Sequence, residues 1–254
     1  MGSVIHRRTF LGGLSASAVL GLPAAARGLV LASNEVYPLL YRGEEGSLSG
    51  YLHDLVVEAA RRAGFPAEIR MMPWPRCVEE TRNGNIDGLF VIFRTAERET
   101  FLSFTNEVLM VQKLCFFARR DSGIHFDGQL GSLSGYRIAA ANKVSYGRAF
   151  DAAVGDGTLR RIELVSGPEV MVRMLLGGRV DLFVLHDLEG FGMLRKLGAE
   201  DKVTILSPPL DEVSGYLAFT RARDLTPLVP AFDEALASMR RDGAYQQLYS
   251  RYFP

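Results

Sequence analysis

NGNIDGLFV (residues 83–91) is echoed by GGRVDLFVL (residues 177–185), and this pair of stretches decides the fold. Gly84 and Gly178 are 94 residues apart, and so are Asp87 and Asp181. Each stretch is typical of a helix that ends on glycine, a turn through aspartate and a strand that enters a hydrophobic core. One such turn occurs in many α/β domains, whereas two with matching flanks indicate two similar lobes.

The flanks of both stretches alternate short apolar runs with amphipathic segments, and this order predicts a parallel sheet with helices on its faces. Around the first stretch we expect strands at 28–33, 67–72 and 86–93 and helices at 51–63 and 75–82. Around the second we expect strands at 137–141, 161–165 and 180–185 and a helix at 146–153. A further helix would start at the capping box 166–169, in which Ser166 and Glu169 are three residues apart.

Two segments are suited to joining the lobes. The long apolar run 108–118 leaves the first lobe, and 216–220 reads as the strand that returns to it, followed by two helices that reach the C-terminus. The expected division is 27–115 plus 216–254 for the first lobe and 116–215 for the second. A cleft between two such lobes is a common place for a ligand.

The first 26 residues read as an export signal. Arg7 and Arg8 precede a weakly apolar stretch, 11–22, and three alanines at 24–26 offer a cleavage site. The arginine pair resembles a twin-arginine signal, although the general export route stays open, and so does an N-terminal core helix. Because the first cysteine is Cys77, we expect a periplasmic protein that is soluble after cleavage and not lipid-anchored.

Composition narrows the function classes. The 254 residues are 48% hydrophobic and 23% charged, which excludes a disordered chain, and 29 basic against 29 acidic residues argue against a nucleic-acid partner. The histidines are scattered, so neither a metal site nor a cofactor is expected. Cys77 and Cys115 could form a disulfide or be buried separately.

Four further motifs carry a family resemblance. They are Gly50–Leu55 (GYLHDL), Thr95–Arg98 (TAER), Ser134–Ile138 (SGYRI) and Gly178–Asp181 (GRVD). Together with the order above, they make residues 28–254 similar to the family-3 extracellular solute-binding proteins, the polar amino acid branch of type II periplasmic binding proteins. The resemblance implies an α/β fold of two Rossmann-like lobes joined by two crossing strands. It also implies a monomer that closes on a small solute and delivers it to an ABC permease.

The resemblance also implies a site. Arg98 would grip a ligand carboxylate through its guanidinium fork, although Arg98 could instead pair with Glu97 or Glu99 on the surface. The other candidate ligand-binding residues are aromatic or polar side chains at strand ends and helix starts, namely Tyr37, Trp74, Arg76, Phe93, Thr95, Ser145, His186 and Asp187.

Three positions depart from the family pattern. Lys143 stands where the family has a glycine before the Ser/Thr site of the second lobe. His186 stands where amino acid binders carry the aspartate that holds the ligand ammonium, and Asp187 follows one residue later. Phe93 stands where a small hydroxyl residue is usual. The sequence therefore predicts a small carboxylate-bearing solute, with an amino acid as the first candidate and its ammonium contact in question.

Three functions remain open on the sequence alone. The first is a binding protein for an ABC importer. The second is an orphan or sensor-linked binding protein for an organic acid. The third is an enzyme that resembles the cyclohexadienyl dehydratases, for which Glu189 and His186 would be the candidate acid and base.

Overall fold

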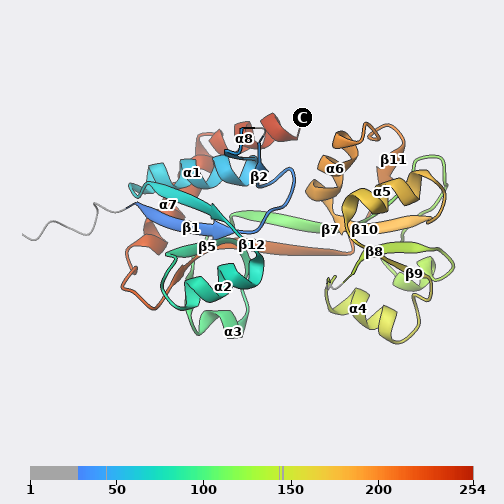
Figure 1. Cartoon of the computed structure of the whole chain (residues 1–254), viewed down its shortest axis with the longest axis horizontal. Coiled ribbons are helices and arrows are strands. Elements are labelled where there is room, and N and C mark those ends of the chain that lie inside the picture. Colours follow the sequence, from blue (N-terminus) through green and yellow to red (C-terminus); the bar gives the residue numbers. More distant parts are fainter. Residues whose placement is uncertain (1–27, 44, 143, 145, 254) are drawn as a thin grey trace, which may run out of the picture.

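Two α/β lobes lie side by side, joined by two long strands (Figure 1). The computed structural model describes residues 28–253 except 44, 143 and 145. The predicted export signal and Ser145 therefore lie outside the described residues. Within the described part, no helix combines the length and the apolar character needed to span a bilayer.

The first lobe contains β1 (Leu29–Ser33), β2 (Tyr41–Arg42), β3 (Leu48–Ser49), α1 (Tyr51–Ala63), β4 (Ala67–Met71), α2 (Trp74–Arg82), β5 (Gly88–Phe93), α3 (Ala96–Glu99) and β6 (Leu102–Phe104), and later α7 (Leu228–Arg241) and α8 (Ala244–Tyr252). The second contains the 3₁₀ turn η2 (Leu130–Leu133), β8 (Ile138–Ala141), α4 (Arg148–Gly155), β9 (Ile162–Val165), α5 (Pro168–Leu176), β10 (Leu182–His186), α6 (Asp187–Lys196) and β11 (Val203–Ile205). The joining strands are β7 (Met110–Arg119) and β12 (Asp211–Thr220).

One sheet runs through both lobes in the order β4-β1-β5-β12-β7-β10-β8-β9, with β6 on β12 and β11 on β7. The order reads the same from either end: three parallel strands of one lobe, the two antiparallel crossing strands, then three parallel strands of the other. The predicted two-lobe α/β architecture is therefore confirmed.

The sequence echo corresponds to an equivalent turn in each lobe. In the first, Asp87 Oδ2 accepts from the Val30 amide at 2.7 Å, and the Asp87 amide donates to the Val30 carbonyl at 2.9 Å. In the second, Asp181 makes the same pair of bonds with Arg137, both at 2.9 Å. Gly84 and Gly178 have φ values of 76° and 66°, in the left-handed region that favours glycine.

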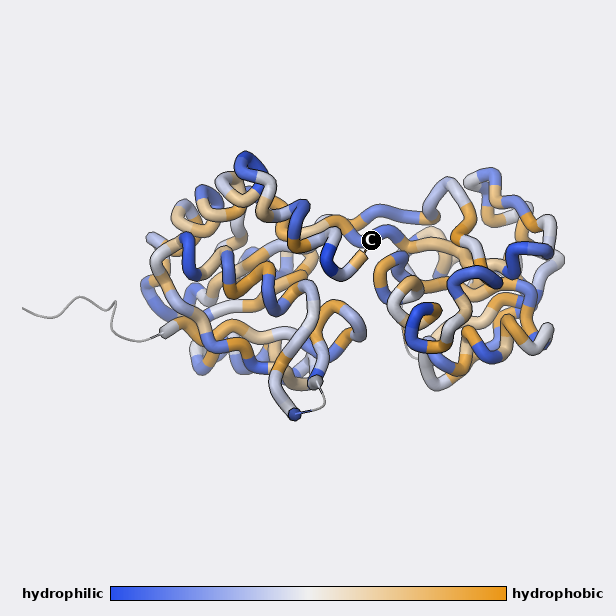
Figure 2. The backbone as a smooth tube through the Cα atoms, turned by 90° about the horizontal axis from the view of Figure 1, so that it is seen from above, coloured by the Kyte–Doolittle hydropathy of each residue, from blue (hydrophilic) through white to orange (hydrophobic). Residues whose placement is uncertain are grey.

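Each lobe has a hydrophobic core on both faces of its sheet. In the first lobe one core lies under α1, α7 and α8 and the other under α2. In the second, α5 and α6 cover one core and α4 the other. Figure 2 shows hydrophobic segments along the inner strands and hydrophilic ones on the outer helices and loops. Cys77 and Cys115 are buried, unbridged, in cores of different lobes.

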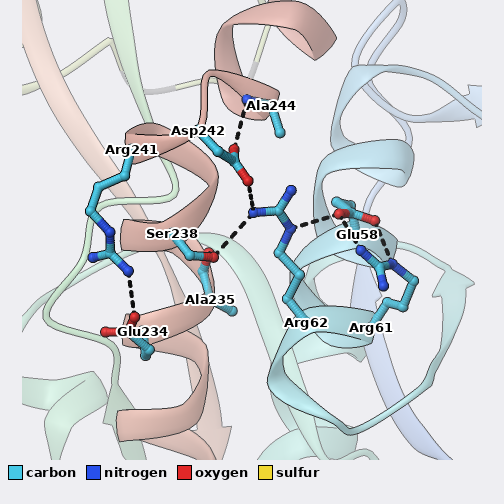
Figure 3. A network of polar contacts seen from close by, with 9 residues as sticks. All are labelled: Glu58, Arg61, Arg62, Glu234, Ala235, Ser238, Arg241, Asp242 and Ala244. Carbon is cyan, nitrogen blue, oxygen red and sulfur yellow. Dashed lines mark hydrogen bonds and ion pairs between the residues drawn. The ribbon is translucent and has the colours of Figure 1, made fainter.

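The C-terminal helices are tied to the first lobe by a polar network on the outer side of α1 (Figure 3). Arg62 donates to Glu58 at 2.7 Å, to Ser238 at 3.2 Å and to Asp242 at 2.5 Å. Hydrogen bonds from Arg61 and Arg62 lower the pKa of Glu58 to about 2. Arg62 and Glu58 are partly buried, whereas Arg61 and Asp242 are exposed, so the network joins α1 to the end of α7 at the edge of their packed faces.

Two local predictions are wrong. Helix α5 starts at Pro168 with Gly167 as its N-cap and no side-chain cap bond, so residues 166–169 do not form a capping box. The returning strand begins at Asp211 and not at 216, because its polar first half pairs with β7 alone. Backbone pairing extends β12 where hydrophobicity gives no signal.

Candidate functional site

The parallel strands of the two lobes point their carboxyl ends at one another. β5 ends at Phe93, opposite Gly215, and β10 ends at His186, opposite Leu114. Gly215 pairs with Met110 and Leu114 pairs with Asp211, so four residues of β7 separate the two strand ends. At about 3.3 Å per residue, the ends stand about 13 Å apart along the crossing strands. Ligands of open α/β sheets bind at such carboxyl ends.

A β-bulge shapes the end of β5. Val91 has φ 56°, rare for a β-branched residue, and the pairing with β12 shifts between Tyr216 and Leu217. Because of the extra residue, Phe90 and the following Val91 both pack in the core under α1, α7 and α8, whereas Ile92 packs in the core on the other face of the sheet. Phe93 belongs to none of the core clusters formed by the described residues and is only partly buried. The bulge therefore delivers an apolar side chain to the strand end.

Arg98 lies in the short helix that follows β5. Thr95 caps this helix by accepting from the Arg98 amide at 3.3 Å. Arg98 Nη1 donates to the Phe93 carbonyl at 2.8 Å, and the guanidinium carbon lies 5.8 Å from the centroid of a Trp74 ring. The structure thus brings four predicted site residues together, from α2, β5 and α3.

No carboxylate partners Arg98 among the ion pairs of the described chain. Glu97 pairs with Arg82 at 3.4 Å and Glu99 with Arg94 at 3.9 Å, so the alternative surface pairing of Arg98 is not what the structure shows. Arg98 is partly buried, and burial lowers the pKa of its guanidinium. A partly desolvated cation with unused N–H donors is ready for an anion.

Two other predicted residues of the first lobe lie apart from this group. Arg76 pairs with Glu80 at 3.6 Å along α2, with 69% of its side chain exposed. Tyr37 packs edge-on against Tyr41 at 4.9 Å, and the Lys196 ammonium lies 5.8 Å from the Tyr37 ring centroid.

Tyr37 therefore lies where the lobes touch. A Cβ on Gly192 of α6 would come within 2.2 Å of Pro38, so only glycine permits this approach. Leu188, also on α6, is buried in a core of the first lobe, and Phe191 contacts Phe253 at 6.2 Å between ring centroids. Helix α6 of the second lobe thus packs directly on the first.

On the second lobe, His186 and Asp187 lie at the start of α6. Burial lowers the pKa of His186, against the charges of Asp187 and Asp211. Asp187 accepts from the amides of Leu188 at 2.8 Å and Lys113 at 3.4 Å, and burial raises its pKa. Ser145 lies outside the described residues. Its neighbour Tyr146 accepts from the Ala141 amide at 2.7 Å, at the end of β8.

Two further carboxylates stand near this end of the second lobe. Glu189 is partly buried, and burial raises its pKa to about 7. Asp211, which the sequence analysis missed, is exposed on β12 and lies near Gly147 and His186. No sequence signal marks Asp211, because its position depends on strand pairing. Among the described residues, no group of three or more metal-ligating side chains occurs.

Comparison with protein families settles the class. The profile described as "Bacterial extracellular solute-binding proteins, family 3" matches residues 29–254. The chain belongs to this family. A search of curated protein sequences finds no match.

Solved structures agree on the fold of this family-3 protein. A histidine kinase sensor domain similar to periplasmic binding proteins has 22% identity and a TM-score of 0.68, covering 89% of this chain and 96% of its own. An ancestral arginine-binding protein bound to arginine has 21% identity and a TM-score of 0.68, covering 90% and 99%. The second substrate-binding domain of Lactococcus lactis GlnP, in an open conformation, has 15% identity and a TM-score of 0.71, covering 89% and 94%. All three share the two-lobe fold of type II periplasmic binding proteins.

Proposed function

We propose that this family-3 protein captures a small carboxylate-bearing solute, in the first place an amino acid, between its lobes and delivers it to an ABC importer. The observation that carries the proposal is Arg98, a partly buried guanidinium without a carboxylate partner among the described residues. It is held by the Phe93 carbonyl at the carboxyl end of β5.

The surroundings of Arg98 suit a small acid. A guanidinium binds a carboxylate through two parallel hydrogen bonds, and this pairing strengthens where water is excluded. The Trp74 ring supplies apolar surface beside the charge, and Phe93 is a partly buried apolar residue at the same strand end; both fit the body of a small solute. Arginine- and glutamine-bound ancestral proteins share the fold, and this supports an amino acid as the solute.

The remaining predictions complete the proposal. Thr95, Ser145 and His186 would line the same cleft, with Tyr37 and Asp187 at its rim on the side of α6. The lobes would divide at 115/116 and 215/216, and residues 1–26 would direct a monomer to the periplasm. The core clusters support the division except near its boundaries and at α6: Leu114 and Cys115 lie in second-lobe cores, and Leu188 and Phe191 pack in a first-lobe core.

A second candidate rests on the sensor-domain neighbour: the same cleft could present its solute to a membrane receptor. Solute binding would be identical in both cases, so the partner separates them. Capture by the liganded protein of a permease, as opposed to a sensor kinase, from solubilised membranes would decide between import and signalling.

The proposal is tested by native mass spectrometry of residues 27–254 as purified, together with a thermal-shift panel of the twenty amino acids and small organic acids. A released small acid, or a rise in melting temperature with a panel acid, is expected because a ligand stabilises the state that binds it. Absence of both refutes the proposed function. For the variant Arg98→Ala, the matched control is Arg94→Ala. Arg94 is a nearby arginine that already donates to the Thr105 carbonyl at 2.7 Å and pairs with Glu99.

A further inference from the structure

An amino acid brings an ammonium group as well as a carboxylate, and this group needs an anionic acceptor. At the position where the family pattern places that acceptor, this chain has His186, and burial lowers the pKa of its ring, which favours the neutral form. The acceptor must therefore be another carboxylate near the strand ends. The candidates in the second lobe and the crossing strands are Asp187, Glu189 and Asp211.

Asp187 is directed to the other face of the sheet. Its Oδ1 accepts from two backbone amides, one of them that of Lys113 on β7. Its charge also acts on Tyr249 of α8, so Asp187 faces the side of the sheet covered by the C-terminal helix. Burial raises the pKa of Asp187, while the hydrogen bonds from the two amides act in the opposite direction.

Glu189 is a poor acceptor for a different reason. Burial raises its pKa to about 7, so a large fraction of this side chain is uncharged near neutrality. Its charge acts on Tyr146, whose hydroxyl covers the end of β8. Glu189 therefore lies within the second lobe, near Tyr146.

Asp211 differs from Asp187 and Glu189 in its exposure and in its position on a crossing strand. It is exposed, it lies on the crossing strand opposite Leu114, and it appears in none of the ion pairs between described residues. Its Oδ1 accepts from the Glu212 amide at 2.8 Å, which leaves Oδ2 directed toward Gly147. Oδ2 lies 3.5 Å from the place that a Cβ on Gly147 would take, and the charge of Asp211 reaches His186. The carboxylate is thus at the carboxyl ends of both β8 and β10.

The spacing from Arg98 fits an amino acid. Arg98 is bound to Phe93, which lies opposite Gly215, and Asp211 lies four residues away from Gly215 along β12. That is a backbone separation of about 13 Å. An α-amino acid held by both groups needs about 9 Å between them, from two charge-assisted contacts of about 2.8 Å and its own span of about 3 Å. The remaining length is within reach of the two side chains.

We infer that Asp211, from the crossing strand β12, binds the ammonium group of the amino acid whose carboxylate Arg98 holds. The inference rests on the proposed function. It places the ammonium acceptor on a strand shared by both lobes, so solute binding would contact the first lobe, the second lobe and the connection between them.

The test is titration calorimetry of wild type, Asp211→Asn and the matched control Glu212→Gln. Glu212 is the adjacent exposed carboxylate and pairs with Lys113 at 3.4 Å. The probes are L-arginine and L-glutamine, each compared with its counterpart lacking the α-amino group, 5-guanidinopentanoate and glutaramate. Asp211→Asn should weaken amino acid binding about 10- to 100-fold, as expected for a lost hydrogen bond between charged groups. It should leave binding of the deaminated probe within about threefold, and Glu212→Gln should change neither.

Three results would overturn the inference while the proposed function stands. They are equal wild-type affinity for a probe with and without its amino group, unchanged amino acid affinity in Asp211→Asn, and an equal loss for both probes. If Asp211→Asn lowers the melting temperature and leaves the affinity unchanged, Asp211 stabilises the N-terminus of α4 electrostatically and does not bind the ligand. If wild type binds none of the probes or panel acids, the proposed function fails with it.

Discussion

Arg98→Ala is the substitution with the largest expected effect on binding and a small expected effect on folding. The variant removes a bidentate pair with the ligand carboxylate, and each hydrogen bond between charged groups contributes about 1.5–3 kcal/mol. A loss of about 3–4 kcal/mol corresponds to about 100- to 1,000-fold in affinity.

The cost to folding follows from the two contacts of the Arg98 side chain. The hydrogen bond to the Phe93 carbonyl contributes about 1 kcal/mol, and the contact with Trp74 about 0.5–1 kcal/mol. Removal of a partly desolvated cation offsets part of this loss. The ligand-free variant should therefore melt within about 4 °C of wild type.

The assay combines calorimetry with thermal unfolding. At a ligand concentration of 100 times the wild-type Kd, wild type gains about 2.7 kcal/mol, whereas a variant weakened 100-fold gains about 0.4 kcal/mol. The ligand-induced rise in melting temperature should fall from about 5–11 °C to about 1–2 °C. Arg98→Lys should lie between the two, because lysine keeps the charge and loses the fork. Unchanged affinity in Arg98→Ala would refute the assignment.

Three other predictions concern selectivity, pH and the lobe repeat. Phe93→Ser should alter the order of preference in an amino acid panel and shift the melting temperature little, because Phe93 lies outside the core clusters; a collapse of cooperative unfolding would make it a core residue. Because burial raises the folded-state pKa of Glu189 to about 7, the free energy of unfolding of wild type should fall by about 1–3 kcal/mol as the pH rises from about 4.5 to 7. In denaturant titrations, Glu189→Gln should make the free energy of unfolding depend less on pH, and an unchanged pH dependence would contradict this. Asp87→Asn should lower the free energy of unfolding by about 3–5 kcal/mol, since Asp87 is 3% exposed and pairs with Arg223 at 2.7 Å. The equivalent variant of the second lobe, Asp181→Asn, should cost less because Asp181 is more exposed. Equal losses in the two variants would contradict the idea that burial determines the cost.

The fold was predictable because its signals are local. Glycine and aspartate at the end of each lobe's second helix determine a turn within a few residues, and the strands that follow are continuous apolar runs. Helix α1 and its left-handed cap Gly64 have the predicted bounds for the same reason. The capping box failed because Gly167, and not Ser166, occupies the N-cap.

Of the proposed site, only the grouping of first-lobe residues could be predicted from the sequence. The sequence places Phe93, Thr95 and Arg98 within six residues of one another, so a motif that contains Arg98 also indicates where the other two lie. Asp211 owes its place to pairing with a strand about 100 residues away, and no local pattern records such pairing. The approach of α6 to the 36–40 turn likewise depends on two small surfaces that meet only in the folded chain.

The central claim is that this protein recognises a carboxylate at Arg98. Calorimetry of wild type with the tightest-binding amino acid of the panel and with its methyl ester tests this most directly, because the ester keeps the shape and the ammonium but removes the negative charge. We expect a loss of about 100-fold or more for the ester in wild type and little difference between acid and ester in Arg98→Ala. An ester that binds wild type as tightly as the acid would contradict it.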